Sequence, residues 1–440
     1  MSARNRELLA LVPASLLLTA GFAAIFIQQS EVLSDVSLTY GAVFLGLCLA
    51  GHLFLRFTLP YADPYLFPLV AVLACFGLVV IYRIDEDLAR TQAQWFVFGL
   101  ALFALTILLL RDLRVLERYR YTIALAGLFL LFLPRVPGIG EQVNGAYLGV
   151  GIGPISFQPS EFGKIAIIVF LAAYLRDTRQ VLVQGSRRIL GVTIPPLKHF
   201  GPILVVWGTA MLMLVIIRDL GSSLMYFGGF VALLYVATNR LSFVVIGMGM
   251  FALGAWFFAS TVSHVQDRVN VWLDPFNPSW VEDEGYQIAQ SVFAQADGGL
   301  FGTGLGASLL RGPGGETLIP APHTDLIYAV ITNELGLVGA CGLILVYMLF
   351  VERGLRTAML ASDSFSKLLA AGLSAVFALQ VFVIVGGVTR VIPLTGVTLP
   401  FVSYGGSSIL ANFVLLALLL LVSDRARRPS GAAAGRRGLR

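Results

Sequence analysis

Long apolar runs without charge recur along the whole chain, and short segments that carry most of the charge separate them. As a helix, a run of ~20 residues crosses the ~30 Å hydrocarbon core of a bilayer. The fifth and sixth runs are the shortest. The pattern predicts twelve membrane-spanning helices, over residues 8–27, 36–55, 64–82, 93–110, 117–134, 158–175, 199–217, 220–238, 242–261, 325–351, 368–388 and 407–423.

Composition excludes the other protein classes. Apolar residues make up 57% of the 440 residues and charged residues 12%, about half the ~25% usual in soluble domains. Disorder needs low hydrophobicity, and an outer-membrane barrel needs short strands that alternate with period two. We therefore predict an all-α polytopic membrane protein. Cys48, Cys75 and Cys341 lie in apolar runs, without the spacing of metal ligands or of a disulfide framework.

The distribution of Lys and Arg predicts the orientation. With the N-terminus inside, the inner segments hold 22 of the 30 basic residues and the outer side holds 8. Basic residues favour the cytoplasmic side, so both termini should be cytoplasmic. The positive charge is spread over loops and the tail, which is the pattern of a topology signal and not of a nucleic-acid-binding surface. We predict a multi-pass protein of the cytoplasmic membrane.

Two outer segments are unusual. The loop from about 261 to 324 is far longer than any other, and long loops are usually functional. Within it, residues 285–296 place Ile288, Val292 and Phe293 on one face of a predicted short helix that can lie in the membrane interface. Residues 393–408 are uncharged and rich in Pro and Gly, which predicts a re-entrant segment covered by protein or water.

Charged residues inside apolar runs are candidates for function, because each costs ~2.5–3.5 kcal/mol to insert. Glu161 and Lys164 are three residues apart and share a helix face. They form either a functional pair or a self-neutralising pair that joins helices, and the residues alone do not decide. For Glu334, in the tenth span, a hydrogen bond to a neighbouring helix is the simpler interpretation.

Other polar positions lie at the outer ends of spans. For Arg218 and Asp219 a solvated turn is the simpler interpretation, and His323 is typical of a hydrogen-bonding loop residue. Asp325 begins the tenth span, where an acid gains ~0.3–1 kcal/mol from the helix dipole. Acids and bases gather on this side: Arg90, Glu161, Lys164, Arg218, Asp219, Arg268 and Asp325. A mixed-charge outer cavity suits a lipid-linked anionic substrate, and it also suits a transporter.

Several motifs, in order and with matching spacing, resemble the SEDS family, the FtsW/RodA/SpoVE proteins of bacterial growth and division. The resemblance covers about residues 63–423. Its motifs are Phe157–Lys164, Asp219–Ser223, Arg268–Val269, Leu273–Pro275, Gly285–Ile288, Gln290–Ser291, Gly298–Leu300, Gly302–Gly304, His323–Asp325, Glu334–Gly336 and Pro400–Ser407.

The chain also departs from the family pattern. Family members commonly have ten spans, so the resemblance implies an accessory helix pair in residues 1–62, a core in 63–423 and a basic, disordered tail in 424–440. The family often has Gln-Pro where this chain has Ile217-Arg218, and a basic-Trp pair where it has Asn144–Leu148. The extra spans and short tail look more like a RodA-type elongation protein than an FtsW-type division protein.

The resemblance implies a glycosyltransferase that joins lipid II units with inversion and releases undecaprenyl pyrophosphate. Asp325 is then the general base for the acceptor hydroxyl. Cations must meet the charge that develops on the diphosphate, and Arg90, Lys164 and Arg268 are the candidates. The resemblance gives supporting roles to the remaining site residues: Glu161 to hold Lys164, Asp219 to orient a cation or a divalent metal, and His323, Ser403 and Tyr404 to bind substrate.

The resemblance also implies partners. A class B penicillin-binding protein would crosslink the new strands, and the apolar spans would contact membrane lipids. A divalent cation such as Mg²⁺ or Mn²⁺ is compatible with a diphosphate substrate, but no ligand cluster in the sequence demands one. The main alternative is a lipid II flippase, for which polar groups should continue to the cytoplasmic side. A scaffold protein, the third alternative, would not need the embedded charges.

Overall fold

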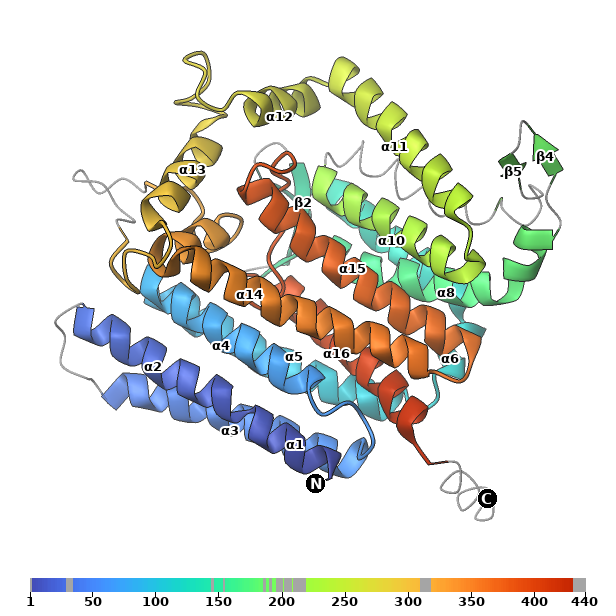
Figure 1. The fold of residues 1–440 in the computed structure, drawn as a ribbon, viewed down its shortest axis with the longest axis horizontal. Helices are drawn as coiled ribbons and strands as arrows, with labels where there is room; N and C mark the ends of the chain where they lie inside the picture. The colour runs from blue at the N-terminus through green and yellow to red at the C-terminus, as the bar shows by residue number, and fades with distance from the viewer. Residues whose placement is uncertain are drawn as a thin grey trace.

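The computed structural model describes residues 2–28, 35–143, 146–152, 155–184, 187–189, 192–194, 201, 208, 219–308 and 318–429. Long helices packed side by side form the bundle (Figure 1). The helices of the N-terminal half are α1 (Ala3–Ala10), α2 (Val12–Gln28), α3 (Asp35–Thr58), α4 (Leu66–Ile84), α5 (Glu86–Leu109), α6 (Arg114–Arg118), α7 (Arg120–Phe132) and α8 (Pro159–Gln184). Those of the C-terminal half are α10 (Leu220–Thr238), α11 (Leu241–Thr261), α12 (Ser263–Leu273), α13 (Tyr286–Gly298), α14 (Ile327–Leu360), α15 (Ser364–Val388) and α16 (Gly406–Arg427).

Nine helices within the described residues are long and apolar enough to cross a membrane. They coincide with nine of the twelve predicted spans. Helix α7 has 13 residues, and α8 begins with the charged pair that made the sixth span weak. The seventh predicted span, 199–217, lies outside the described residues apart from positions 201 and 208. A mostly helical membrane protein is therefore confirmed, and the count of twelve stays a prediction.

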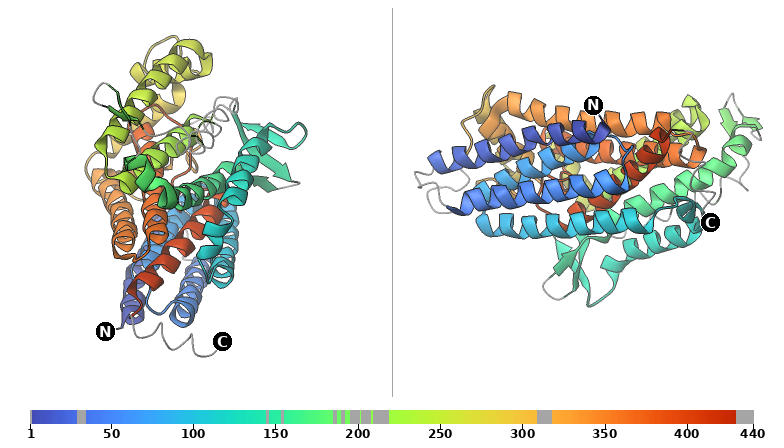
Figure 2. Two further views of the ribbon diagram at one scale, coloured as in Figure 1. Left: turned by 90° about the vertical axis from the view of Figure 1, so that its right-hand side faces the viewer. Right: turned by 90° about the horizontal axis from the view of Figure 1, so that it is seen from below.

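The expectation of an all-α fold is wrong at two places. Strands β1 (Gly140–Val143), β2 (Ala146–Ile152) and β3 (Ile155–Phe157) form an antiparallel sheet beside the helices (Figure 2). Strands β4 (Arg187–Ile189) and β5 (Val192–Ile194) form a hairpin. The alternation of Tyr and Gly with Leu, Val and Ile along β2 has the strand period of two and could have revealed the larger sheet.

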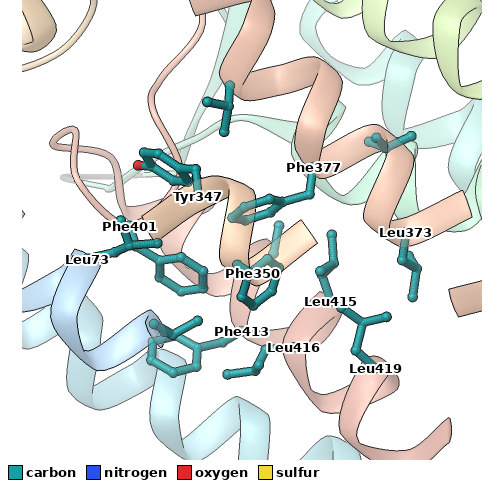
Figure 3. Packing of buried hydrophobic residues seen from close by; sticks show 14 of the residues in the cluster. Leu73, Tyr347, Phe350, Leu373, Phe377, Phe401, Phe413, Leu415, Leu416 and Leu419 are labelled. Carbon is teal, nitrogen blue, oxygen red and sulfur yellow. The ribbon is translucent and has the colours of Figure 1, made fainter. Parts of the chain in front are cut away.

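Aromatic and aliphatic side chains fill the interior between α14, α15, α16 and the segment that precedes α16 (Figure 3). The Tyr347 hydroxyl, fully inside this cluster, donates a hydrogen bond to the carbonyl of Pro400 (2.7 Å). Small residues let the helices approach closely: a Cβ on Gly99 of α5 would lie 2.3 Å from the Phe413 ring of α16. Such close packing is the main source of helix association in lipid.

The N-terminal helices are joined to the bundle by a buried ion-pair network at the end that the basic residues predict to be cytoplasmic. The Glu7 carboxylate, fully buried, contacts the Arg4 guanidinium and the His52 ring (2.8 Å). Arg4 also donates to the carbonyl of Ala62. The next residue, Asp63, is fully buried as well. The predicted boundary between accessory pair and core at 62/63 is thus a place of tight contact.

Asp63 links three further elements of the core. Its carboxylate pairs with Arg427 of α16 (2.5 Å) and Arg353 of α14 (3.7 Å). Its backbone N–H donates to the Ser423 hydroxyl (3.0 Å). Every charge here has an opposite charge beside it, which offsets the cost of burial. The network ties the chain before α4 to the ends of α14 and α16.

Candidate functional site

Asp325 lies in a turn two residues before α14, whose first helical residue is Ile327. Asp325 therefore lies just before the first helical turn and not in it, which weakens the explanation based on the helix dipole. Within the described residues, no donor makes a hydrogen bond to the Asp325 carboxylate. Burial raises the pKa of this carboxyl to about 6, and the charge of Arg268 opposes the shift. Near neutral pH it is a deprotonated group able to accept a proton.

Arg268 is the cation whose charge acts on two carboxylates of the site. It lies on α12 and interacts electrostatically with both Asp219 and Asp325. Its guanidinium donates to the carbonyl of Leu394 (2.8 Å), which fixes α12 on the segment between α15 and α16. Trp272 and Arg390 strengthen this contact, because each donates a side-chain hydrogen bond of 3.0 Å to the backbone carbonyl of the other.

His323, Ser403 and Tyr404 come together beside Asp325. The Tyr404 N–H donates to the carbonyl of His323 (2.8 Å), and the two rings meet edge to face at 5.7 Å. The Ser403 hydroxyl donates to the carbonyl of Thr324 (2.7 Å) and accepts from the N–H of Leu399 (2.9 Å). Burial lowers the pKa of His323, so its imidazole is neutral at neutral pH. Residues 393–408, the predicted re-entrant segment, are thus joined to the turn that carries Asp325.

Gln92 of α5 is a further part of this junction that sequence reasoning missed. Its amide nitrogen donates to the carbonyl of Ser403 (3.0 Å), and its amide oxygen accepts from the N–H of Gly405 (3.2 Å). The side chain is buried. Gln92 lies in the polar stretch just before the predicted span 93–110, where a single uncharged polar residue gives no specific signal of this contact.

Glu161 and Lys164 form the predicted pair, with 2.5 Å between Oε2 and Nζ, and both are almost fully buried. Gln380 of α15, which sequence reasoning also missed, completes a triad. Its amide oxygen accepts from Lys164 (2.5 Å), and its amide nitrogen donates to the carbonyl of Thr398 (3.0 Å). In this conformation the Lys164 ammonium is directed to these partners. Its role toward a diphosphate stays a prediction.

Asp219 is the N-cap of α10, and its carboxylate accepts from the N–H (3.0 Å) and hydroxyl (2.5 Å) of Ser222. It is 6% exposed, so the interpretation as a solvated turn is wrong for this residue. Burial raises the pKa of its carboxyl, and the hydrogen bonds from Ser222 oppose this. Arg218 lies outside the described residues. Arg90, near the N-terminal end of α5, is exposed and pairs with Glu86 (3.3 Å) and Asp87 (3.6 Å).

The glycine-rich loop, residues 298–308, packs against a break in α14. Gly336 has φ +67°, a left-handed conformation that favours glycine. The backbone on both sides of the break pairs with the loop: Thr303 N–H bonds to Asn333 O (2.9 Å), and Leu337 N–H to Gly299 O (3.0 Å). The freed helix groups are thereby satisfied.

Glu334 has a structural role, but its hydrogen bonds go to the glycine-rich loop and not to a neighbouring helix as expected. Its carboxylate is buried, accepts from the N–H of Gly306 (3.0 Å) and the Ser308 hydroxyl, and faces Arg83 of α4 at 3.6 Å. Its partners belong to the glycine-rich loop and to α4, so the glutamate joins this loop to α4. In the described part of the chain, no three His, Cys, Asp or Glu side chains gather as metal ligands, so no ligand set for Mg²⁺ or Mn²⁺ is assigned.

Comparison with known proteins gives concordant matches. The family model described as "Cell cycle protein", for the FtsW, RodA and SpoVE proteins, matches residues 64–428. The chain is 42% identical over 437 residues to the peptidoglycan glycosyltransferase RodA of Mycobacterium tuberculosis, covering 97% of this chain and 92% of the relative. It is 31% identical over 363 residues to the stage V sporulation protein E of Bacillus subtilis, covering 82% and 93%.

Solved structures agree with this fold. Thermus thermophilus RodA matches with a TM-score of 0.58 and 27% identity, over 84% of this chain and 98% of that one. A chain from a structure described as "Structural coordination of polymerization and crosslinking by a peptidoglycan synthase complex" matches with a TM-score of 0.65 and 26% identity, over 84% and 99%. The helices and these matches define a multi-pass membrane protein. The chain belongs to the FtsW/RodA/SpoVE family.

Proposed function

We propose that this protein is a peptidoglycan glycosyltransferase that joins lipid II units at the outer face of the cytoplasmic membrane. Relatives that share 42% of the sequence over nearly the whole chain carry the name peptidoglycan glycosyltransferase RodA, whereas those named FtsW share 31–32%. This difference favours a RodA-like role in cell elongation and shape. The observation that carries the mechanism is the partly buried Asp325 carboxylate, whose pKa is raised to about 6 and which accepts no hydrogen bond within the described residues.

The reaction follows from that carboxylate. The 4-hydroxyl of the acceptor sugar attacks the anomeric carbon of the donor, and the hydroxyl proton passes to Asp325. The bond from the anomeric carbon to the pyrophosphate oxygen breaks, and undecaprenyl pyrophosphate leaves with the electron pair. Because the attack comes from the opposite face, the anomeric centre inverts. The leaving group needs positive charge rather than a proton, and Arg268 is the cation that interacts electrostatically with the base.

His323, Ser403 and Tyr404 position the substrate in this proposal. Their backbone and hydroxyl groups join the Asp325 turn to the re-entrant segment. A sugar bound by the re-entrant segment is therefore held next to the turn that carries Asp325. Asp219 keeps Arg268 oriented through their electrostatic contact. Lys164 and Arg90 complete the cationic set, with Glu161 holding Lys164.

The decisive assay is polymerisation of lipid II by the purified protein in detergent, where there is no bilayer to flip across. Glycan strands on a gel support the transferase. Purified protein that binds lipid II without producing strands, alone and with its partner, would favour the flippase alternative. The same assay with Asp325→Asn tests the base.

The proposed topology has twelve spans, both termini in the cytoplasm and Asp325 facing outward. It rests on the distribution of basic residues. A single cysteine at position 280 should react with a membrane-impermeant thiol reagent from outside, and one at position 190 should not. Native Cys341 is exposed and must first be replaced. Outside labelling of position 190 would overturn the orientation.

A class B penicillin-binding protein is the proposed partner, and the match to a chain from a peptidoglycan synthase complex supports this choice. Its single span would pack on the lipid-exposed face of α14, which offers Leu345, Met348 and the uncovered Gly342. Small and aliphatic residues of this kind favour helix association. The outer loop around Trp280 is a second proposed contact.

Gly342→Trp should reduce co-purification of the transpeptidase. Gly254→Trp on α11 is the matched control, because space around that glycine is equally open. Equal retention of the partner by both variants would move the interface elsewhere.

A further inference from the structure

A cavity of about 260 Å³ opens between α3, α4 and α5. The side chains at its base are buried and entirely hydrocarbon. They come from α3, α4, α5, the re-entrant segment and α16: Phe44, Ala74, Leu78, Phe96, Phe401 and Ile409. Val43 and Val97, which also line the cavity, are 56% and 44% exposed. The cavity is therefore a pocket that opens between α3 and α5 toward the lipid.

The polar groups of the pocket lie at one end. Arg90, Gln92 and Gln94 line it from the first turns of α5, whereas Phe96 and Val97 follow further along the helix. This end holds two amides and Arg90, whose guanidinium pairs with Glu86 and Asp87. An amphiphile with a long hydrocarbon chain and a polar head matches this division of apolar and polar walls.

The polar end is continuous with the candidate site. Gln92 lines the pocket and donates to the carbonyl of Ser403, and the Ser403 hydroxyl donates to the carbonyl of Thr324, the residue before Asp325. Phe401, two residues before Ser403, forms part of the pocket wall. One hydrogen-bonded segment thus contacts both the pocket and the turn of the proposed base.

We propose that this pocket binds the polyprenyl chain of the lipid-linked substrate, with the diphosphate end directed past Arg90 and Gln92 toward Asp325. The proposal rests on the proposed function, because that function supplies a polyprenyl-linked substrate. Helix α3 contributes Val43, Phe44 and Leu47. The accessory helix pair therefore completes the pocket, which gives these helices a role in substrate binding.

Filling the pocket tests the proposal. Ala93→Trp places an indole in the cavity from α5, and Leu47→Trp does so from α3 as an independent variant. The matched control is Ala101→Trp, at an exposed position of α5 that does not line the cavity. Each buried CH₂ of a chain contributes ~0.8 kcal/mol, so loss of a few should raise the KM for full-length lipid II by about tenfold or more.

A lipid II analogue with a chain of two isoprene units separates the pocket from the reaction. We expect both filling variants to lose their KM defect with this analogue, and Ala101→Trp to behave like the unaltered protein with both substrates. Unchanged KM values for the filling variants, or equal defects with long and short chains, would overturn the pocket assignment. Because the unaltered protein and the control report polymerisation independently, absence of strands from both would instead indicate failure of the proposed function.

Occupancy can also be read without activity. Undecaprenyl phosphate with a diazirine on its chain should crosslink to α3 and α5 of the purified protein, and Ala93→Trp should reduce that crosslinking. A phosphatidylglycerol with a diazirine on its acyl chain should crosslink there far less. Equal crosslinking by the phospholipid would mean that the pocket is a general lipid site, and the proposal would be wrong.

Discussion

Carboxylates lie inside the protein at both ends of its helix bundle, and Asp325 differs from those at the opposite end in how it is paired. At the end predicted to be cytoplasmic, Glu7 contacts Arg4 and His52, and Asp63 contacts Arg427 and Arg353. At the other end, Asp325 accepts no hydrogen bond within the described residues and has only the charge of Arg268 opposing its burial.

This difference separates structural from chemical uses of buried charge. A carboxylate whose oxygens are taken by opposite charges holds elements together, and removing it leaves those charges unpaired. A carboxylate without such partners contributes little to stability, but it is available to receive a proton. Glu334 shows that the distinction is not simply one of location, since it lies close to the candidate site and is nevertheless saturated by loop groups.

The largest expected effect is on activity, from Asp325→Asn. Loss of the general base should reduce polymerisation by ~10²–10⁴-fold. Because burial disfavours the charged form of Asp325, the amide should leave the thermal stability unchanged or increase it at pH 7. Strand synthesis on a gel and thermal unfolding in detergent measure both quantities. Near-normal synthesis would refute the base assignment and direct attention to Asp219 and Glu161.

Glu7→Gln should have the opposite profile. It leaves the buried Arg4 guanidinium without its anion, and breaking a buried pair costs ~3–5 kcal/mol. Activity per folded molecule should remain. Glu352→Gln is the matched control, because Glu352 pairs with Arg353 at the surface and is 51% exposed, where such pairs contribute ~0–1 kcal/mol. If Glu7→Gln were as stable as the control, the two ends would not differ as described.

Lys164→Met tests a pair that could belong to either class. The single substitution leaves Glu161 unpaired in a buried position and should lower the unfolding temperature. The double variant Glu161→Gln/Lys164→Met removes both charges and should recover much of that stability. If the recovered protein polymerises normally, the pair is structural. If it stays impaired, the cation also serves the diphosphate.

The smallest expected effect is the dependence of activity and stability on pH. With the Asp325 pKa at about 6, kcat/KM for polymerisation should be near its plateau at pH 7.5 and about tenfold lower at pH 5, because only the deprotonated base acts. The contribution of Asp325 to the free energy of unfolding changes with pH in the direction opposite to the activity. The folded pKa is raised above the ordinary value of 3.8, so stability is greatest below pH 3.8 and decreases as pH rises to about 6. Asp325→Asn should remove this decrease, and a decrease of equal size in the variant would assign it to other groups.

Local patterns predicted the local elements well. The amphipathic stretch 285–296 is found as α13, Tyr286–Gly298, and the apolar runs became helices wherever the structure describes them. The spacing of Glu161 and Lys164 also predicted their contact, because residues three apart lie on one turn of a helix. The sheet was missed because its short strands follow each other closely among much longer apolar runs.

Sequence patterns did not predict the contacts between segments that are far apart in the chain. His52 meets Glu7 across 45 positions, and Gln380 meets Lys164 across 216. Neither Gln92 nor Gln380 carries a charge, so neither stands out in a search for charges in apolar runs. The position of Asp325 alone favoured a helix-end acid, and the resemblance to a family was needed to single it out. The features that set it apart are partial burial and the absence of hydrogen-bond donors among the described residues, and both depend on the tertiary structure.

The break at Gly336 has a consequence for where chemistry occurs relative to the bilayer. A straight helix with the 34 residues of α14 would measure ~51 Å, well beyond the ~30 Å hydrocarbon core. The part after the break, Leu337–Leu360, reaches ~36 Å and is sufficient to cross. In the proposed orientation the ~13 Å of helix before the break, Ile327–Leu335, lies on the outer side of the spanning part and is largely buried by protein. The height of the carboxylate is therefore set by chain length, and a bilayer with a thicker core would bring its headgroups closer to Asp325.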